Sequence, residues 1–244
     1  MLILLPPSET KRPGGVGISI DKQAIIWAAL DPARDKLIAA LEKLSKNAEK
    51  AQRALKLGKR NWGDLQANQT LLTTPTMPAV ERYTGVLYDA LDFQSLDLAA
   101  RKRAGESLFI QSALFGLLPA LEQIPYYRFS ADSKLDRINL KNLWREAHKE
   151  VWPRLVGDVL DLRSKAYVEL NPVPESHRSW FVEVVDSKGK ALNHFNKKAK
   201  GSFVRAALQI GLTGIEDVAK VAPSAGLKAQ IQEQTVFLEV PEGF

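Results

Sequence analysis

Residues 193–205 combine basic side chains with the spacing of a helix. At about 100° per residue, Lys197, Lys198 and Arg205 fall on one side of that helix, whereas Phe203 falls on the other. A helix that begins near Lys197 also directs free backbone N–H groups towards an anion. The pattern therefore predicts an amphipathic helix with one basic face, which is typical of a solvated surface and also suits phosphate contact.

A second basic segment lies at residues 48–69, where two short helices are expected on either side of Gly58. Such a pair, with cations at the joint, resembles a helix-hairpin-helix, whose backbone N–H groups hold a DNA phosphate. The alternative is an αα-corner with a C-cap glycine, because the paired glycines of that hairpin are absent and the next glycine is Gly63. The residues expected to contact DNA at the joint are Lys56, Gly58, Lys59 and Arg60.

The apolar run at residues 1–5 predicts a central strand that stops at Pro6-Pro7. The loop that follows carries a hydroxyl, a carboxylate and two cations just beyond the strand, where open α/β sheets place ligand sites. Ordinary turn chemistry accounts for the same loop equally well. Other polar residues lie near the ends of further apolar runs. The candidate cleft consists of Ser8, Glu9, Lys11, Ser112, Arg128, Asp161 and Arg163.

The composition excludes several kinds of site. Cysteine is absent, which rules out disulfides, thiolate nucleophiles, iron–sulfur ligation and cysteine-based zinc sites. The three histidines, His148, His177 and His194, are far apart in the sequence, so a histidine-rich metal site is not expected. Neither a catalytic triad nor a glycine-rich phosphate loop is evident, and no cofactor is expected. The net charge of +6 favours an anionic partner.

The first apolar run has five residues, which is too short for a signal peptide or a membrane span. No later run approaches the roughly 18 apolar residues that a membrane helix needs. We therefore expect a cytoplasmic protein that has no membrane partner.

Apolar strands alternate with amphipathic helices along the chain. The predicted strands are at residues 1–5, 81–85, 108–118, 124–130, 159–164, from Val168, at 180–185 and at 235–240. A chain of 244 residues with 45% apolar content can bury one large core. We therefore expect an α/β fold: a single compact domain over residues 1–244, with a mixed β-sheet flanked by helices.

Four segments, in order along the chain, are similar to the YaaA peroxide-stress protein family. They are Pro6-Pro7-Ser8-Glu9-Thr10-Lys11, Tyr83-Thr-Gly-Val-Leu-Tyr-Asp89, Ser112-Ala-Leu-Phe-Gly-Leu-Leu-Pro119 with Pro125-Tyr-Tyr-Arg128, and Lys197-Lys-Ala-Lys-Gly201 with Arg205. The resemblance implies a compact α/β domain in the bacterial cytosol and a role in limiting oxidative, iron-linked damage under hydrogen peroxide. It also implies DNA binding through a positive cleft and a helix-hairpin-helix.

The resemblance assigns four residues to the basic helix of the family: Lys197, Lys198, Lys200 and Arg205. It places the hairpin near residues 57–63. Some relatives carry Ser-Pro-Ala-Lys-Thr where this chain has Pro-Pro-Ser-Glu-Thr-Lys, so no role common to the family is assigned to Ser8 or Glu9.

The sequence leaves two functions open. In the first, the protein binds duplex or branched DNA through backbone contacts that are largely independent of base sequence. In the second, the same cleft belongs to an enzyme that acts on a nucleotide or another anionic small molecule, although no catalytic motif is recognisable. Convergence of Glu9, Lys11 and Arg128 in one deep pocket favours the enzyme. A shallow groove that joins the two basic segments favours DNA.

Overall fold

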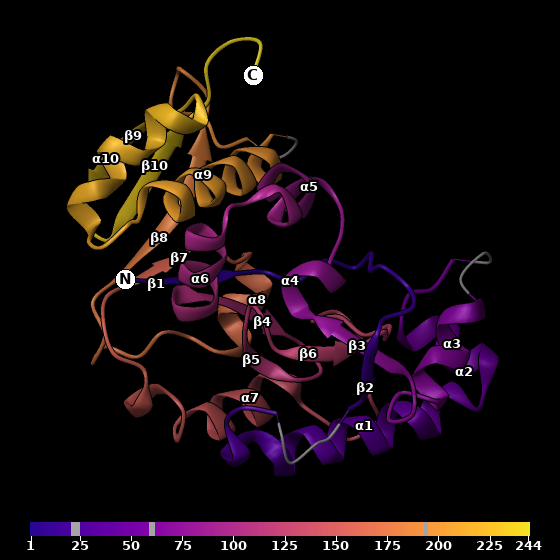
Figure 1. Ribbon diagram of the computed structural model, residues 1–244. Helices are drawn as coiled ribbons and strands as arrows, with labels where there is room; N and C mark the ends of the chain where they lie inside the picture. The colour runs from indigo at the N-terminus through magenta and orange to yellow at the C-terminus, as the bar shows by residue number, and fades with distance from the viewer. Residues whose placement is uncertain (21–24, 59–61, 193–194) are drawn as a thin grey trace.

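The computed structural model describes residues 1–20, 25–58, 62–192 and 195–244. Within these ranges the strands form a seven-stranded sheet and a three-stranded sheet (Figure 1). The order along the larger sheet is β5 (Gly116–Pro119), β4 (Leu108–Ser112), β1 (Leu2–Leu5), β7 (Val159–Asp161), β8 (Ser179–Val185), β10 (Thr235–Glu239) and β9 (Lys228–Gln232). The five inner strands are parallel, whereas each edge strand is antiparallel to its neighbour. The mixed sheet expected from the sequence is therefore confirmed.

Strands are added to the larger sheet on both sides of β1, so the direction in which the sheet grows along the chain reverses there. The chain adds β4 on one side of β1 and then crosses over to add β7, β8 and β10 on the other side. Numbered along the chain, the five parallel strands thus lie in the order 2-1-3-4-5, a common order of doubly wound α/β sheets. Such sheets bind ligands outside the carboxyl ends of the strands, at the point of reversal. That point lies between β1 and β7, where Leu4 pairs with Asp161.

Helices form a layer on each side of the larger sheet (Figure 1). One layer holds α5 (Val86–Leu91), α6 (Leu98–Ser107), α9 (Asn196–Ile210) and α10 (Val218–Val221). The other holds α1 (Asp31–Ser45), α7 (Leu140–His148) and α8 (Lys165–Leu170). The Trp144 indole of α7 donates to Ala113 O at 2.8 Å, and His148 Nε2 accepts from the Leu117 N–H at 3.1 Å. These bonds fix α7 to the β4–β5 hairpin, one at the connection and one at β5.

α9 crosses α5 at Gly201, where the two backbones are very close. A Cβ at Gly201 would lie 2.1 Å from Leu87 O and 2.8 Å from the Ala90 Cβ. Any larger residue would therefore push the helices apart. Because Lys197 is one helical turn before Gly201, this crossing also sets the position of the first turn of α9.

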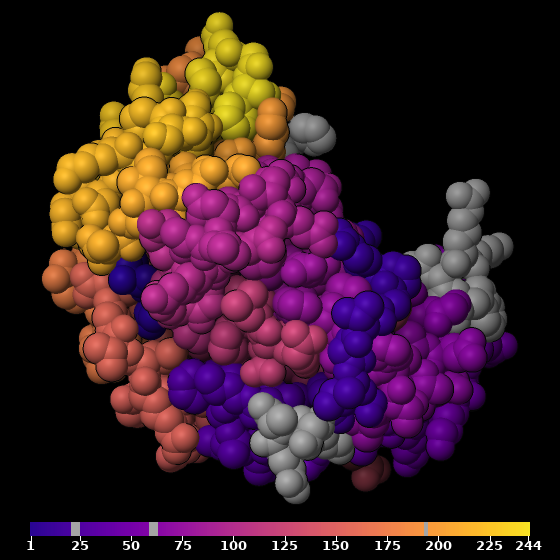
Figure 2. All heavy atoms as spheres, in the orientation of Figure 1, coloured from indigo at the N-terminus to yellow at the C-terminus, as the bar shows by residue number. Residues whose placement is uncertain are grey.

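The antiparallel three-stranded sheet contains β2 (Gly17–Ser19), β3 (Pro75–Pro78) and β6 (Gln123–Pro125). The buried guanidinium of Arg82, at the end of α4 (Ala79–Arg82), joins it to the N-terminal segment. It donates to the carbonyls of Arg12, Gly14, Pro75 and Ile124. Nearby, α2 (Ala48–Ala54) and α3 (Trp62–Gln69) pack on α1. Figure 2 shows the N-terminal segment, in indigo, at the surface beside this part of the chain.

Several strand predictions are wrong or too long. Residues 81–85 hold the end of α4 and its connection to α5, and Val168 lies in α8. Residues 108–118 form the β4–β5 hairpin instead of one strand. The Ser112 hydroxyl accepts from the N–H groups of Leu114 and Phe115, and Gly116 has a φ of 77°, so the chain reverses there. Within residues 124–130 only the start is a strand.

The two short helices expected at residues 48–69 are present as α2 and α3. The left-handed residue after α2 is Lys56, with a φ of 53°, and not Gly58. A Cβ on Gly58 would meet nothing within 4 Å, so neither backbone conformation nor packing requires glycine there. Lys59 and Arg60 lie outside the described residues. The hairpin between the helices therefore stays a prediction.

Candidate functional site

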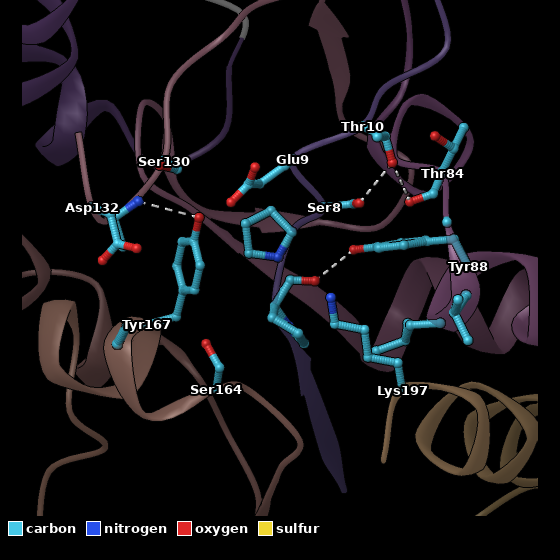
Figure 3. Close-up of a pocket in the computed structure, with 17 residues that line it drawn as sticks. Ser8, Glu9, Thr10, Thr84, Tyr88, Ser130, Asp132, Ser164, Tyr167 and Lys197 are labelled. Carbon is cyan, nitrogen blue, oxygen red and sulfur yellow. Dashed lines mark hydrogen bonds between the residues drawn. The ribbon is translucent and has the colours of Figure 1, made fainter. Parts of the chain in front are cut away.

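A pocket of about 510 Å³ lies at the carboxyl ends of β1 and β7, where the strand order reverses. Its walls come from the loop after β1, the start of α5, the turn at residues 130–132, the start of α8 and the first turn of α9 (Figure 3). Segments that are far apart in the sequence therefore meet where a doubly wound sheet places its ligand.

Hydroxyl groups fix the loop after β1 against α5. The buried Tyr88 phenol donates to Pro6 O at 2.8 Å. Thr10 Oγ1 donates to Thr84 O at 3.2 Å and lies 3.1 Å from the Ser8 hydroxyl (Figure 3). Burial raises the pKa of Tyr88 well above its ordinary value, so this phenol stays protonated and able to donate. This wall of the pocket is thus held in place by hydrogen bonds of the protein itself.

Lys11 lies behind the pocket wall and is only 8% exposed. Its ammonium donates to Ser8 O at 3.0 Å and to Glu9 O at 3.4 Å, and it lies 4.3 Å from the centre of the Tyr127 ring. Burial, and then the neighbouring Arg128 cation, lower the pKa of Lys11 to about 7. Lys11 therefore shapes the loop and does not line the pocket.

Glu9 lines the pocket, and Arg128 holds it. Arg128 donates to the Glu9 carboxylate and to the Glu9 carbonyl, each at 3.0 Å. The Arg128 side chain is 15% exposed, whereas the Glu9 side chain is 66% exposed. Of the three residues expected to converge, Glu9 is the one in the wall, and Lys11 and Arg128 support its loop. Glu9 alone of these three residues therefore lines the pocket.

Lys197 is the cation of the pocket. It lies in the first turn of α9 and is exposed, and its ammonium points into the space between Tyr88 and Ser164 (Figure 3). Among the residues that the structure describes, its ammonium has no hydrogen-bond or ion-pair partner. Lys198 is also exposed, with its ammonium 4.5 Å from the centre of the Phe244 ring. Both lysines are available to an anion.

The other two cations assigned to the basic helix are not available in the same way. Lys200 is 5% exposed and donates to Leu162 O at 3.0 Å. Burial lowers the pKa of Lys200 to about 8. Arg205 donates to the carbonyls of Leu91 and Asp92 at the end of α5. The structure therefore corrects the sequence prediction for these residues, because both bind backbone carbonyls that complete neighbouring elements.

Ser112, Asp161 and Arg163 lie beneath the pocket and not in its wall. The Ser112 hydroxyl is buried, 2.8 Å from the Tyr127 phenol. Two nitrogens of Arg163 donate to the Asp161 carboxylate, at 2.8 and 2.6 Å, and a third donates to Asn171 O at 2.8 Å. Their assignment to the cleft is therefore wrong. These polar groups are buried and satisfy one another, as charges in a protein interior must.

The end of α2 lies near the pocket through the pair formed by Lys56 and Asp132. Their charged atoms are 3.6 Å apart, and each side chain is 64% exposed. Asp132 lines the pocket, so Lys56 lies at its rim. Gly58 is exposed and has no contact that assigns it a role.

The sequence did not indicate four residues that line the pocket: Tyr88, Asp132, Ser164 and Tyr167. Tyr88 belongs to a segment that carries the family resemblance, and Ser164 follows a predicted strand at the carboxyl end where ligand sites are expected. Those two signals could have identified them. Asp132 and Tyr167 enter the wall only through tertiary packing, in which the Tyr167 oxygen accepts from the Ala131 N–H at 3.3 Å.

Among the described residues, the pocket lining combines the unpaired Lys197 ammonium, two carboxylates and several hydroxyls with apolar side chains. This set of groups suits the binding and orientation of a polar anion. Over the described parts of the chain, no cluster of three or more histidine, aspartate or glutamate side chains could hold a metal ion. No helix there has the length and apolar character to span a membrane.

A family model described as "Peroxide stress protein YaaA" matches residues 1–232. The chain belongs to this family. A UPF0246 protein of Streptomyces coelicolor is 41% identical over 218 residues, which cover 86% of this chain and 84% of the relative. A UPF0246 protein of Corynebacterium glutamicum is 37% identical over 235 residues, or 93% and 94% of the two chains. An uncharacterized protein of Campylobacter jejuni is 28% identical over 248 residues, or 98% and 99%. The resemblance noted from the sequence is thus confirmed.

Proposed function

We propose that this member of the peroxide-stress family binds DNA by its phosphates, largely without base specificity, and thereby limits oxidative, iron-linked damage. The observation that carries the proposal is the pair of exposed lysines in the first turn of α9, Lys197 and Lys198, neither of which has an acidic partner among the described residues. The free N–H groups of that turn add partial positive charge on the same side.

The charges around the pocket mouth favour a polyanion. Exposed lysines adjoin the lining on several sides: Lys56 pairs with Asp132, Lys134 follows two residues later, and Lys165 follows Ser164. The two carboxylates of the wall are already paired, Glu9 with Arg128 and Asp132 with Lys56. A strand of DNA across the mouth would therefore meet cations whose acidic neighbours are neutralised. Contacts of this kind release counterions and confer affinity that falls steeply with salt.

The proposal is tested by DNA binding of a charge-reversal variant across a salt series. Lys197→Glu/Lys198→Glu should weaken binding to every duplex sequence, and the slope of log K against log salt should decrease by about 0.9 for each lost phosphate contact. Fluorescence anisotropy with labelled duplex and branched DNA measures both quantities.

A matched control reverses two exposed lysines on α1, Lys36 and Lys43, which lie in the opposite helix layer. The control variant has the same net charge as the first variant. Any difference in DNA affinity between the two variants is therefore due to the position of the lysines and not to total charge. Equal salt slopes and equal affinities for the two variants would refute a DNA contact at the first turn of α9.

A further inference from the structure

We propose that the pocket at the carboxyl ends of β1 and β7 is a binding site for one nucleoside monophosphate, with the phosphate at Lys197 and the base directed towards Glu9 and Asp132. A nucleotide inside the pocket is a different ligand from DNA that lies across the pocket mouth. The proposal is that the nucleotide binds, and no reaction is implied. Because free nucleotide is the ligand, the inference does not rest on the proposed function.

The size of the pocket suits a mononucleotide. Small-molecule sites are typically about 300–1,000 Å³, and this pocket has about 510 Å³. Such a volume equals that of a cube about 8 Å on edge, whereas the major groove of B-DNA alone is about 12 Å wide. Duplex DNA therefore cannot enter, whereas a ligand of the size of one nucleotide fits the pocket.

The polarity of the pocket matches the two ends of a nucleotide. Lys197 lies on one side, and the carboxylates of Glu9 and Asp132 lie on the other (Figure 3). Pro7 and Ala166 contribute apolar surface to the lining. A nucleotide has the same arrangement, with an anionic phosphate at one end and a base that carries N–H donors at the other. Glu9 and Asp132 already pair with Arg128 and Lys56, so their carboxylate oxygens can accept N–H groups of a base, whereas Lys197 has no acidic partner among the described residues and is left for the phosphate.

Two aromatic rings flank the space that the base would occupy. Tyr88 and Tyr167 lie on opposite sides of the pocket (Figure 3). Their phenol oxygens are bonded to Pro6 O and to the Ala131 N–H, so both rings are held before a ligand arrives. A base of any type can stack on such a ring. Little order then has to be created on binding, which favours affinity.

The test is isothermal titration of the full chain with adenosine monophosphate, with adenosine and with inorganic phosphate. We expect one molecule of the monophosphate to bind per chain. Adenosine should bind about tenfold or more weakly, because it lacks the charge-assisted contact to Lys197. Phosphate should also bind more weakly, because it lacks the stacked base. Lys197→Ala should weaken the monophosphate by about tenfold and leave adenosine unchanged.

A variant that fills the pocket distinguishes this site from any other. Ala166→Trp places a large side chain in the wall and should abolish monophosphate binding. Ala99→Trp, at an exposed position of α6 outside the lining, is the matched control and should bind as the parent does. Tyr167→Leu removes one ring without filling the space and should weaken the monophosphate and adenosine alike. Circular dichroism verifies that each variant is folded.

Three outcomes would overturn the inference: no binding of the monophosphate to the parent, binding that survives Ala166→Trp, or phosphate binding as tight as that of the monophosphate. The last would mean that only an anion is recognised. DNA binding by the parent is measured separately, so failure of the DNA proposal and failure of this one give different results.

Discussion

Lys11 should make the stability of the folded protein rise with pH above neutrality. Its ammonium is buried behind the pocket wall, and burial lowers its pKa from the ordinary 10.5 to about 7. The unfolded chain therefore holds this proton up to a much higher pH than the folded chain does. Between pH 7 and pH 10.5, unfolding takes up a proton, and raising the pH in that window favours the folded state. Below pH 7 both states are protonated, and the cost of burying the charge is fully present.

The magnitude follows from the two pKa values. Each pH unit over which the two states differ by one proton changes the free energy of unfolding by about 1.36 kcal/mol. With a pKa of about 7 in the folded state, the proton difference integrated from pH 7 to pH 9 gives roughly 2 kcal/mol. Lys11→Met removes this titration. The parent should therefore gain about 2 kcal/mol relative to the variant over that interval.

Urea unfolding at pH 7 and at pH 9, followed by tryptophan fluorescence, measures the difference. The variant also loses two hydrogen bonds to the loop after β1, which shifts its stability at both pH values, so only the change between them is diagnostic. Lys36→Met, at an exposed site of α1, serves as the control and should follow the parent. If the free energy of unfolding changes by the same amount between pH 7 and pH 9 in the parent and in Lys11→Met, the conclusion that this lysine titrates near neutrality is refuted.

Two substitutions test how the fold supports the site. Gly201→Ala should lower the free energy of unfolding by about 2–3 kcal/mol, because its Cβ would overlap Leu87 O. Gly63→Ala in α3 is the control: its Cβ meets open space, so it should be neutral or stabilising by up to about 1 kcal/mol. Arg163→Met should cost about 3–5 kcal/mol, because it leaves the Asp161 carboxylate buried without its partner. Urea denaturation measures both. Adding Asp161→Asn to Arg163→Met should recover part of the lost stability, because it removes the unpaired carboxylate. If stability is not recovered, the unpaired Asp161 charge is not the cause of the loss.

The strands with continuous apolar runs could be predicted from the sequence. β1, β7, β8 and β10 are each mainly apolar: β1 and β7 are buried along their whole length, whereas β8 and β10 largely alternate buried and half-buried residues. β9 could not be predicted, because it reads Lys-Ala-Gln-Ile-Gln and is an exposed edge strand whose only sheet partner in the described structure is β10. The start of α8 was mistaken for the approach to a strand because Tyr167 and Val168 are residues that favour strands. In each case tertiary pairing outweighed local composition.

The position of the site was more predictable than its members. Ligand sites lie beyond the carboxyl ends of parallel strands, which indicated the loop with Ser8 and Glu9, and both residues line the pocket. The same reasoning failed for Asp161 and Arg163, which also lie at a strand end but point into the protein and satisfy each other. Strand position alone does not say which polar side chain faces the ligand. That choice depends on which groups already have a partner in the folded chain.

Existing partners also distinguish the cations of α9 from one another. Lys197 and Lys200 are only about 60° apart around a helix, so periodicity alone could not separate them. The structure separates them through their neighbours: Lys200 reaches the carbonyl of Leu162 just beyond β7, whereas Lys197 faces the pocket. Together with the Gly201 crossing, the buried lysine holds the first turn of α9 against the end of β7. Lys197 is thereby held at the pocket although its ammonium makes no hydrogen bond or ion pair with the described part of the chain, so the ammonium can meet a ligand.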